Sequence, residues 1–69
     1  MESVVEFAIY KGPQGKNRLN TGASYPVTIY IYNNKYWVVA RRSNSLKDYG
    51  EFWYADMCDL LEQWEFPKH

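Results

Sequence analysis

Hydrophobic and polar residues alternate along much of this chain, which is the pattern of β-strands with one buried face. The alternation is clearest over residues 26–42, where two runs of β-branched and aromatic residues flank Asn33-Asn34. Two such runs around an Asn-Asn pair predict a β-hairpin with a two-residue loop. In that register one face pairs Val27 with Ala40, Ile29 with Val38 and Ile31 with Tyr36, and the other pairs Thr28 with Val39, Tyr30 with Trp37 and Tyr32 with Lys35. The first face is a plausible core, and the second carries aromatic side chains that a small domain need not bury.

The residues before the hairpin predict one strand and a long loop. Residues 4–10 alternate, with one face formed by Val5, Phe7 and Ile9. The glycines and the proline of residues 11–17 disfavour regular structure, so this segment is expected to be a loop. Leu19 follows it as the expected inward anchor. Pro26 has no N–H for a strand ladder, so we place it at the first residue of its strand or on an edge.

The residues after the hairpin predict a polar connection and a short strand. Residues 43–50 form the connection, with Leu46 and Tyr49 as its expected anchors. Residues 51–54 form the short strand.

A helical segment precedes the last strand. Asp56 is a good N-cap, and Asp59 at the third helical position resembles the acidic residue of a capping box. One or two helical turns fit, with the expected inward side chains Met57, Leu60 and Leu61. Residues 63–66 alternate again and predict a last strand that Pro67 ends.

These elements describe one mainly all-β domain over residues 1–69, a five-stranded barrel with one short helical turn before the last strand. Closing the sheet removes exposed edges, which suits a short all-β chain. The order of elements resembles that of the SH3-like barrels. Residues 19–27 are similar to the Gly-x-x-Tyr-x-Val opening of small SH3-like proteins common in phages and prophages, and residues 61–66 to their closing strand. The resemblance implies a phage-type accessory protein. The peptide-binding motif of eukaryotic SH3 domains is absent, so recognition of Pro-rich peptides is not implied.

Size and composition argue against an enzyme. The chain has 69 residues, of which 3 are Trp, 7 Tyr and 3 Phe. Such a domain has a net stability of only a few kcal/mol, and an enclosed substrate pocket of ~300 Å³ or more would remove much of its core. The net charge is zero, but residues 1–47 sum to +5 and residues 48–69 to −5. In a barrel these halves intermingle, so we expect the split to cancel partly in space.

No residue set matches a catalytic, metal or cofactor motif. The loop around Gly12 and Gly15 lacks the spacing of a phosphate-binding loop and its Ser or Thr after Lys16. Asp56, Asp59 and Glu62 lack the shaped loop of a calcium site, and the expected role is a solvated acidic face. Cys58 has no histidine to activate it, since His69 is single and terminal, so we expect a small semi-buried side chain. We therefore expect no catalytic residue, metal or cofactor.

The chain also lacks an apolar stretch long enough for a signal peptide or a membrane span. A cytoplasmic location is the expectation, which means the host cytoplasm for a phage-encoded protein.

The aromatic side chains on the hairpin's second face are the best candidates for function. Aromatic residues with arginine are typical of protein interfaces, which predicts a partner-binding set of Tyr30, Tyr32, Trp37, Arg41, Arg42 and Trp53. The first hypothesis is a module that docks on a host or defence protein and inhibits it, as a monomer or weak homo-oligomer. The alternative is a nucleic-acid-binding barrel that stacks bases on Tyr30 or Trp37 and contacts phosphates through Lys11, Lys16, Arg18, Lys35, Arg41 and Arg42. A further alternative is equally open: the aromatic pairs only stabilise the sheet and have no role in binding.

Overall fold

The computed structural model describes residues 2–43 and 47–67. It contains the strands β1 (Glu2–Tyr10), β2 (Ser24–Tyr32), β3 (Lys35–Arg41), β4 (Tyr49–Tyr54) and β5 (Trp64–Glu65), with the 3₁₀ helix η1 (Lys16–Arg18) and the helix α1 (Met57–Gln63). Five antiparallel strands and one short helix before the last strand confirm the predicted all-β fold class.

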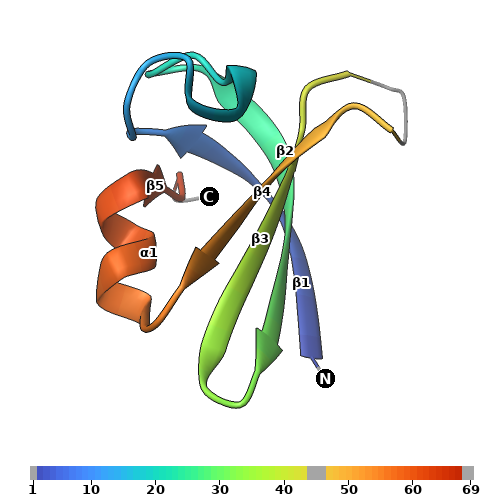
Figure 1. Ribbon diagram of the computed structural model, residues 1–69, viewed down its shortest axis with the longest axis vertical. Helices are drawn as coiled ribbons and strands as arrows, with labels where there is room; N and C mark the ends of the chain where they lie inside the picture. Colours follow the sequence, from blue (N-terminus) through green and yellow to red (C-terminus); the bar gives the residue numbers. More distant parts are fainter. Residues whose placement is uncertain (1, 44–46, 68–69) are drawn as a thin grey trace.

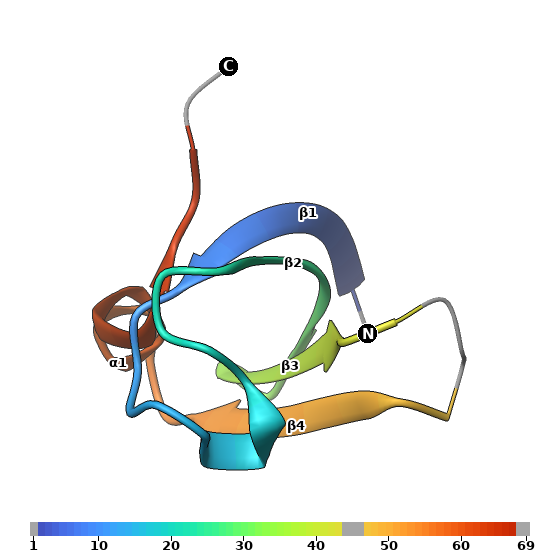
Figure 2. The same ribbon diagram turned by 90° about the horizontal axis from the view of Figure 1, so that it is seen from above.

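The strands form one curled sheet in the order β4-β3-β2-β1-β5. In the described part of the chain, β4 and β5 do not pair with each other, so the sheet is a half-barrel and not a closed barrel. Figure 2 shows the curl from above, with α1 beside the opening between the two ends of the sheet. Figure 1 shows the same helix next to β5 and across from β3 and β4.

The central hairpin has the predicted register at all six positions, from Val27–Ala40 to Tyr32–Lys35. Asn33 and Asn34 have φ angles of 50° and 64°. Two consecutive positive φ angles are what a type I′ turn requires, and asparagine tolerates them better than other residues with a side chain. The Asn-Asn pair thus fixes the register of β2 against β3, and the register decides which side chains face the core.

The core lies on the concave side of the sheet. Its buried residues come from every strand, from α1 and, with Leu19, from the segment after η1: Ala8, Tyr10, Leu19, Val27, Ile29, Val38, Ala40, Phe52, Leu60 and Trp64. The inner face of the hairpin supplies the centre of the core, as predicted, and Leu19 is fully buried as the expected anchor. Trp64 is the largest side chain with no exposed area.

The structure decides which of the two faces of β1 meets the core, a choice that the sequence left open. Ala8 and Tyr10 point into the core, whereas Val5 is 73% exposed and Phe7 is 65% exposed. The register with β2 explains the choice, because Glu6 lies opposite the buried Val27 and even-numbered residues of β1 therefore share its face. Both faces of β1 carry apolar residues, so alternation alone did not say which one is inner.

Pro26 is the third residue of β2, so its placement at the first residue is wrong. It lies opposite Phe7 in β1, but the β2–β3 ladder begins only at Val27. The proline therefore pairs on one side only, which makes its position locally an edge of the sheet, as expected from its missing N–H. Tyr49 opens β4 opposite Arg41 and is 41% exposed, so it is not an anchor. The other expected anchor, Leu46, lies outside the described residues.

The N-cap of α1 is confirmed, because a side-chain oxygen of Asp56 accepts a hydrogen bond from the backbone N–H of Asp59 at 2.9 Å. Of the three side chains expected to point inward, only Leu60 is buried. Met57 and Leu61 are 45% and 48% exposed, because one narrow face of a seven-residue helix meets the sheet. Cys58 is exposed and not semi-buried. β5 is shorter than predicted, since the helix extends to Gln63.

Candidate binding surfaces

Three aromatic side chains form a row across the convex face of the sheet. Tyr30 of β2 lies opposite Trp37 of β3, which lies opposite Trp53 of β4. The rings of Tyr30 and Trp37 stack with centroids 4.8 Å apart and planes 29° apart. Those of Trp37 and Trp53 stack at 5.3 Å and 5°. We call these three residues the aromatic row.

The burial of the aromatic row decides which parts of the rings another molecule can reach. Trp37 is half-buried between its two neighbours, so both of its ring faces are covered. Its indole N–H has no hydrogen-bond partner among the described residues. Trp53 is 65% exposed and stacks on one side only, so it leaves an indole face free. The row therefore offers one open indole face and a fixed set of ring edges.

The convex face carries further apolar side chains beyond the aromatic row. Exposed members are Val5 and Phe7 on β1 and Tyr49 on β4. Strand register places Val5, Thr28, Val39 and Glu51 in the neighbouring row. Exposed apolar patches of this kind mark interaction surfaces in soluble proteins. The exposed face of β1 can be identified only when the register of β1 against β2 is known. The sequence alone does not give that register.

The structure brings together half of the predicted partner-binding residues. Tyr30, Trp37 and Trp53 form the aromatic row. Tyr32 is 56% exposed at the hairpin end, opposite Lys35. Arg41 lies at the far end of β3, opposite Tyr49.

Arg42 takes part in a local structural network. Its Nε donates a 2.6 Å hydrogen bond to Oδ1 of Asp48, and its Nη1 donates to the backbone oxygen of Asn17 at 2.5 Å. The hydrogen bond from Arg42, with a second from Ser43, holds the pKa of the Asp48 carboxyl below its usual value. Asn17 in turn donates its side-chain amide to the backbone oxygen of Glu51. The Arg42 side chain thus links the loop after β1 to the connection before β4.

Basic and acidic residues from the two halves of the sequence meet in space. The Arg42–Asp48 ion pair joins a basic and an acidic residue across the charge split. One surface depression is lined by Lys16 from the first half and by Asp59 and Glu62 from α1. The +5 and −5 of the sequence therefore partly cancel within the fold.

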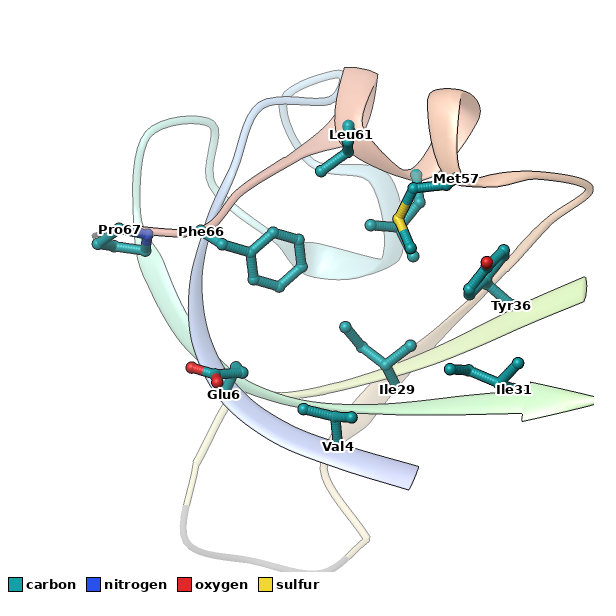
Figure 3. A pocket seen from close by; sticks show the side chains of 10 residues that line it. Val4, Glu6, Ile29, Ile31, Tyr36, Met57, Leu61, Phe66 and Pro67 are labelled. Carbon is teal, nitrogen blue, oxygen red and sulfur yellow. The ribbon is translucent and has the colours of Figure 1, made fainter. Parts of the chain in front are cut away.

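A second surface feature is an apolar groove at the mouth of the half-barrel, with a volume of about 330 Å³. Figure 3 shows side chains from β1, β2, β3, α1 and the C-terminal segment converging on it. The groove is lined by Val4, Glu6, Ile29, Ile31, Tyr36, Met57, Leu60, Leu61, Phe66 and Pro67. Met57 and Leu61 contribute to this groove and not to the core interior, which explains their partial exposure.

Two tyrosines carry hydrogen bonds at the core boundary. Burial raises the pKa of Tyr54 to about 12, although its hydroxyl accepts a 2.9 Å hydrogen bond from the indole N–H of Trp64. Burial, with a smaller effect from Tyr25, also raises the pKa of Tyr10, whose hydroxyl donates to the backbone oxygen of Pro13. Both tyrosines stay neutral at physiological pH, and their contacts are structural.

The described residues bring together no group of three or more His, Cys, Asp or Glu side chains suited to a metal ion. Among the same residues, no helix has the length and apolar character needed to cross a bilayer. Comparison of the chain with protein-family models, with characterised proteins and with solved structures found no match in any of the three.

Proposed function

We propose that the protein is a non-enzymatic binding module that recognises another protein through the aromatic row on its convex face. The observation that carries the proposal is the exposed indole of Trp53 on strand β4, held parallel to Trp37 of the neighbouring strand β3. Tyrosine and tryptophan are among the residues most enriched at hot spots, the few positions that contribute most of the binding energy of a protein interface. They also supply large contact areas at a low cost in side-chain entropy.

Preorganisation supports the proposal. Each ring of the aromatic row stands on a strand that is paired to its neighbour, and Trp37 is fixed by stacking on both sides. A partner therefore meets side chains that are already ordered, and little further entropy is lost on binding. The exposed Val5 and Phe7 on the same face extend the apolar contact area around this centre.

The same geometry favours a protein over a nucleic acid. Stacking of successive bases needs several free ring faces, but both faces of Trp37 are covered by other rings, and the aromatic row offers one open indole face, that of Trp53. The basic side chains are also dispersed. Arg42 is engaged by Asp48, and Lys16 lies 5.9 Å from the ring centre of Phe52. A sequence pI near 6.5 is well below that of typical nucleic-acid-binding domains.

We further propose that docking inhibits the partner, as an accessory protein of the phage type acting on a host or defence protein in the cytoplasm. This part rests on the resemblance of residues 19–27 and 61–66 to small SH3-like phage proteins. A rigid aromatic patch that covers the functional surface of a partner inhibits that partner by blocking the surface, and no catalytic step is needed.

Affinity capture from a lysate of the native host tests the proposal. Matched baits are the unchanged protein, Trp53→Ala and Tyr49→Ala, because Tyr49 lies on the same face of the same strand but outside the aromatic row. We expect one protein to be retained by the unchanged and Tyr49→Ala baits after nuclease treatment, and to be lost with Trp53→Ala. Equal retention by all three baits would show that the row is not the interface. Retention that disappears with nuclease treatment would favour the nucleic-acid alternative.

A further inference from the structure

Strand β1 has an open edge. It is nine residues long and pairs with β2 from Glu2 to Ile9. On its other side β5 covers only Ile9 and Tyr10. Within residues 2–43 and 47–67, the segment from Glu2 to Ala8 therefore pairs on one side only, and Figure 1 shows this part of β1 at the border of the sheet. An unpaired strand edge presents main-chain donors and acceptors to another strand.

Hydrogen bonds near the end of β1 show which residues present those groups. The N–H of Tyr10 donates to Ala23 and its C=O accepts from Gly22, both on the β2 side. The next N–H, of Lys11, donates to Gln63 on the opposite side. In an antiparallel strand these directions alternate from residue to residue. Ser3, Val5 and Phe7 therefore point their N–H and C=O groups toward the open edge.

The chain's own C-terminal segment does not fill this edge. Continuing the β1–β5 register past Glu65 would place Pro67 opposite Phe7. Phe7 offers a main-chain acceptor there, but proline has no N–H to donate. In Figure 2 the chain after β5 runs away from β1. Among the described residues, no segment other than β2 pairs with this part of β1.

We propose that the occupant is the β1 strand of a second copy of this protein, paired antiparallel about a two-fold axis at Val5. In this register Val5 lies opposite Val5 of the second copy, and Ser3 lies opposite Phe7 of the second copy. All three residues present main-chain groups to the edge, so they form three hydrogen-bonded pairs, or about six hydrogen bonds. A two-fold axis makes the interface self-complementary and closes the assembly as a dimer.

Charge selects this register among its neighbours. Moving the axis to Val4 would place residues 2 and 6, both glutamates, opposite each other twice. Moving it to residue 6 would place Glu6 opposite its own copy. Like charges at directly opposite positions destabilise a strand pair. The axis at Val5 avoids both, since residue 6 then lies opposite Val4.

The side chains of the edge also fit a strand pairing. Val5 and Phe7 are among the most exposed apolar residues of the described chain, and the proposed pairing covers part of both. Natural proteins commonly protect such an edge with charged side chains, proline or a bulge. Residues 2–10 contain neither lysine nor proline, and the ladder with β2 is uninterrupted. The charged Glu6 of this edge lies opposite Val4 in the proposed register, which tolerates it. The dimer joins two convex faces into one surface with two aromatic rows.

Cysteine cross-linking tests the register in a Cys58→Ser background, which removes the exposed native thiol. In the proposed dimer the two Val5 positions form a hydrogen-bonded pair with Cα atoms about 5.5 Å apart, within the range of a disulfide. The two Ser3 positions are displaced by four residues, or roughly 13 Å along the strands. We expect Val5→Cys to form a disulfide-linked dimer and Ser3→Cys, at the same open edge, to stay uncross-linked. Equal cross-linking of both variants, or none of Val5→Cys, would overturn the proposal.

Mass measurement tests the assembly without cross-links. Sedimentation of the unchanged protein should show twice the 8.2 kDa chain mass as its concentration rises toward about 1 mM. Val5→Lys should remain monomeric with unchanged circular dichroism, because the side chain at this position is 73% exposed in the single chain. Val5→Thr, uncharged and β-branched, should still dimerise. A monomeric unchanged protein over the whole range, or a Val5→Lys variant that still dimerises, contradicts the inference.

Discussion

The indole rings of Trp37 and Trp53 lie parallel, with centroids 5.3 Å apart and planes 5° apart, although they belong to different strands. Cross-strand pairing at directly opposite positions makes this geometry possible. Trp37 is covered on both faces, whereas Trp53 leaves one face to solvent. The inner member of the pair thus supports the outer one, and their substitution should have different consequences.

Trp37→Ala should destabilise the fold more than Trp53→Ala. Aromatic pairs contribute about 0.5–1.5 kcal/mol beyond their buried area, and Trp37 takes part in two pairs whereas Trp53 takes part in one. Urea unfolding at neutral pH gives the two changes in free energy. If Trp53→Ala costs as much as Trp37→Ala, Trp53 has a structural role that its exposure does not suggest.

Replacing Tyr54 by Phe should destabilise the protein at neutral pH. The substitution removes the acceptor for the indole N–H of Trp64, which has no exposed area. Leaving a buried donor unpaired costs about 1–3 kcal/mol. Urea unfolding of both proteins at neutral pH measures this difference.

Alkaline pH should reduce that difference. Burial raises the pKa of Tyr54 from 10.0 to about 12 in the folded chain. The neutral phenol therefore contributes stability below pH 10 that is lost as the pH rises through about 12. Tyr54→Phe cannot ionise at this position, so its unfolding free energy should approach that of the unchanged protein over this range. A constant difference across the same range would contradict the shifted pKa.

Asp48→Asn should lower stability at neutral pH and leave it unchanged in strong acid. The hydrogen bond from Arg42 keeps the pKa of Asp48 below the usual value of 3.8. A lowered pKa means that the ionised carboxylate contributes stability above pH 3.8, which is lost as the pH falls through the folded-state pKa. Urea midpoints of the two proteins should converge in acid. A stability difference that persists unchanged in acid would contradict the lowered pKa of Asp48.

The hairpin was predictable from sequence because a two-residue Asn-Asn loop fixes one register, and that register assigns every side chain of β2 and β3 to a face. The N-cap at Asp56 was predictable because it depends on local spacing. The hairpin contains Tyr30 and Trp37, so the pairing of two of the three members of the aromatic row was predictable from the sequence.

The inner face of β1 was not predictable in this way. Val4, Ala8 and Tyr10 alternate with Val5, Phe7 and Ile9, so both faces look apolar, and only pairing with β2 decides between them. The exposure of Met57 and Leu61 depends on how α1 meets the half-barrel, which is likewise a tertiary property. The stacking of Trp53 on Trp37 required the β3–β4 register, which no short turn encodes.

The most direct measurement of the central claim is a calorimetric titration of the captured partner with the unchanged protein, Trp53→Ala and Tyr49→Ala. Truncation of an interface hot spot costs about 2 kcal/mol or more, which is a Kd increase of roughly thirty-fold. We predict a loss of at least that size for Trp53→Ala and less than about three-fold for Tyr49→Ala, whose position on the same strand lies outside the aromatic row. A Trp53→Ala Kd within three-fold of the unchanged protein would contradict the aromatic row as the binding surface.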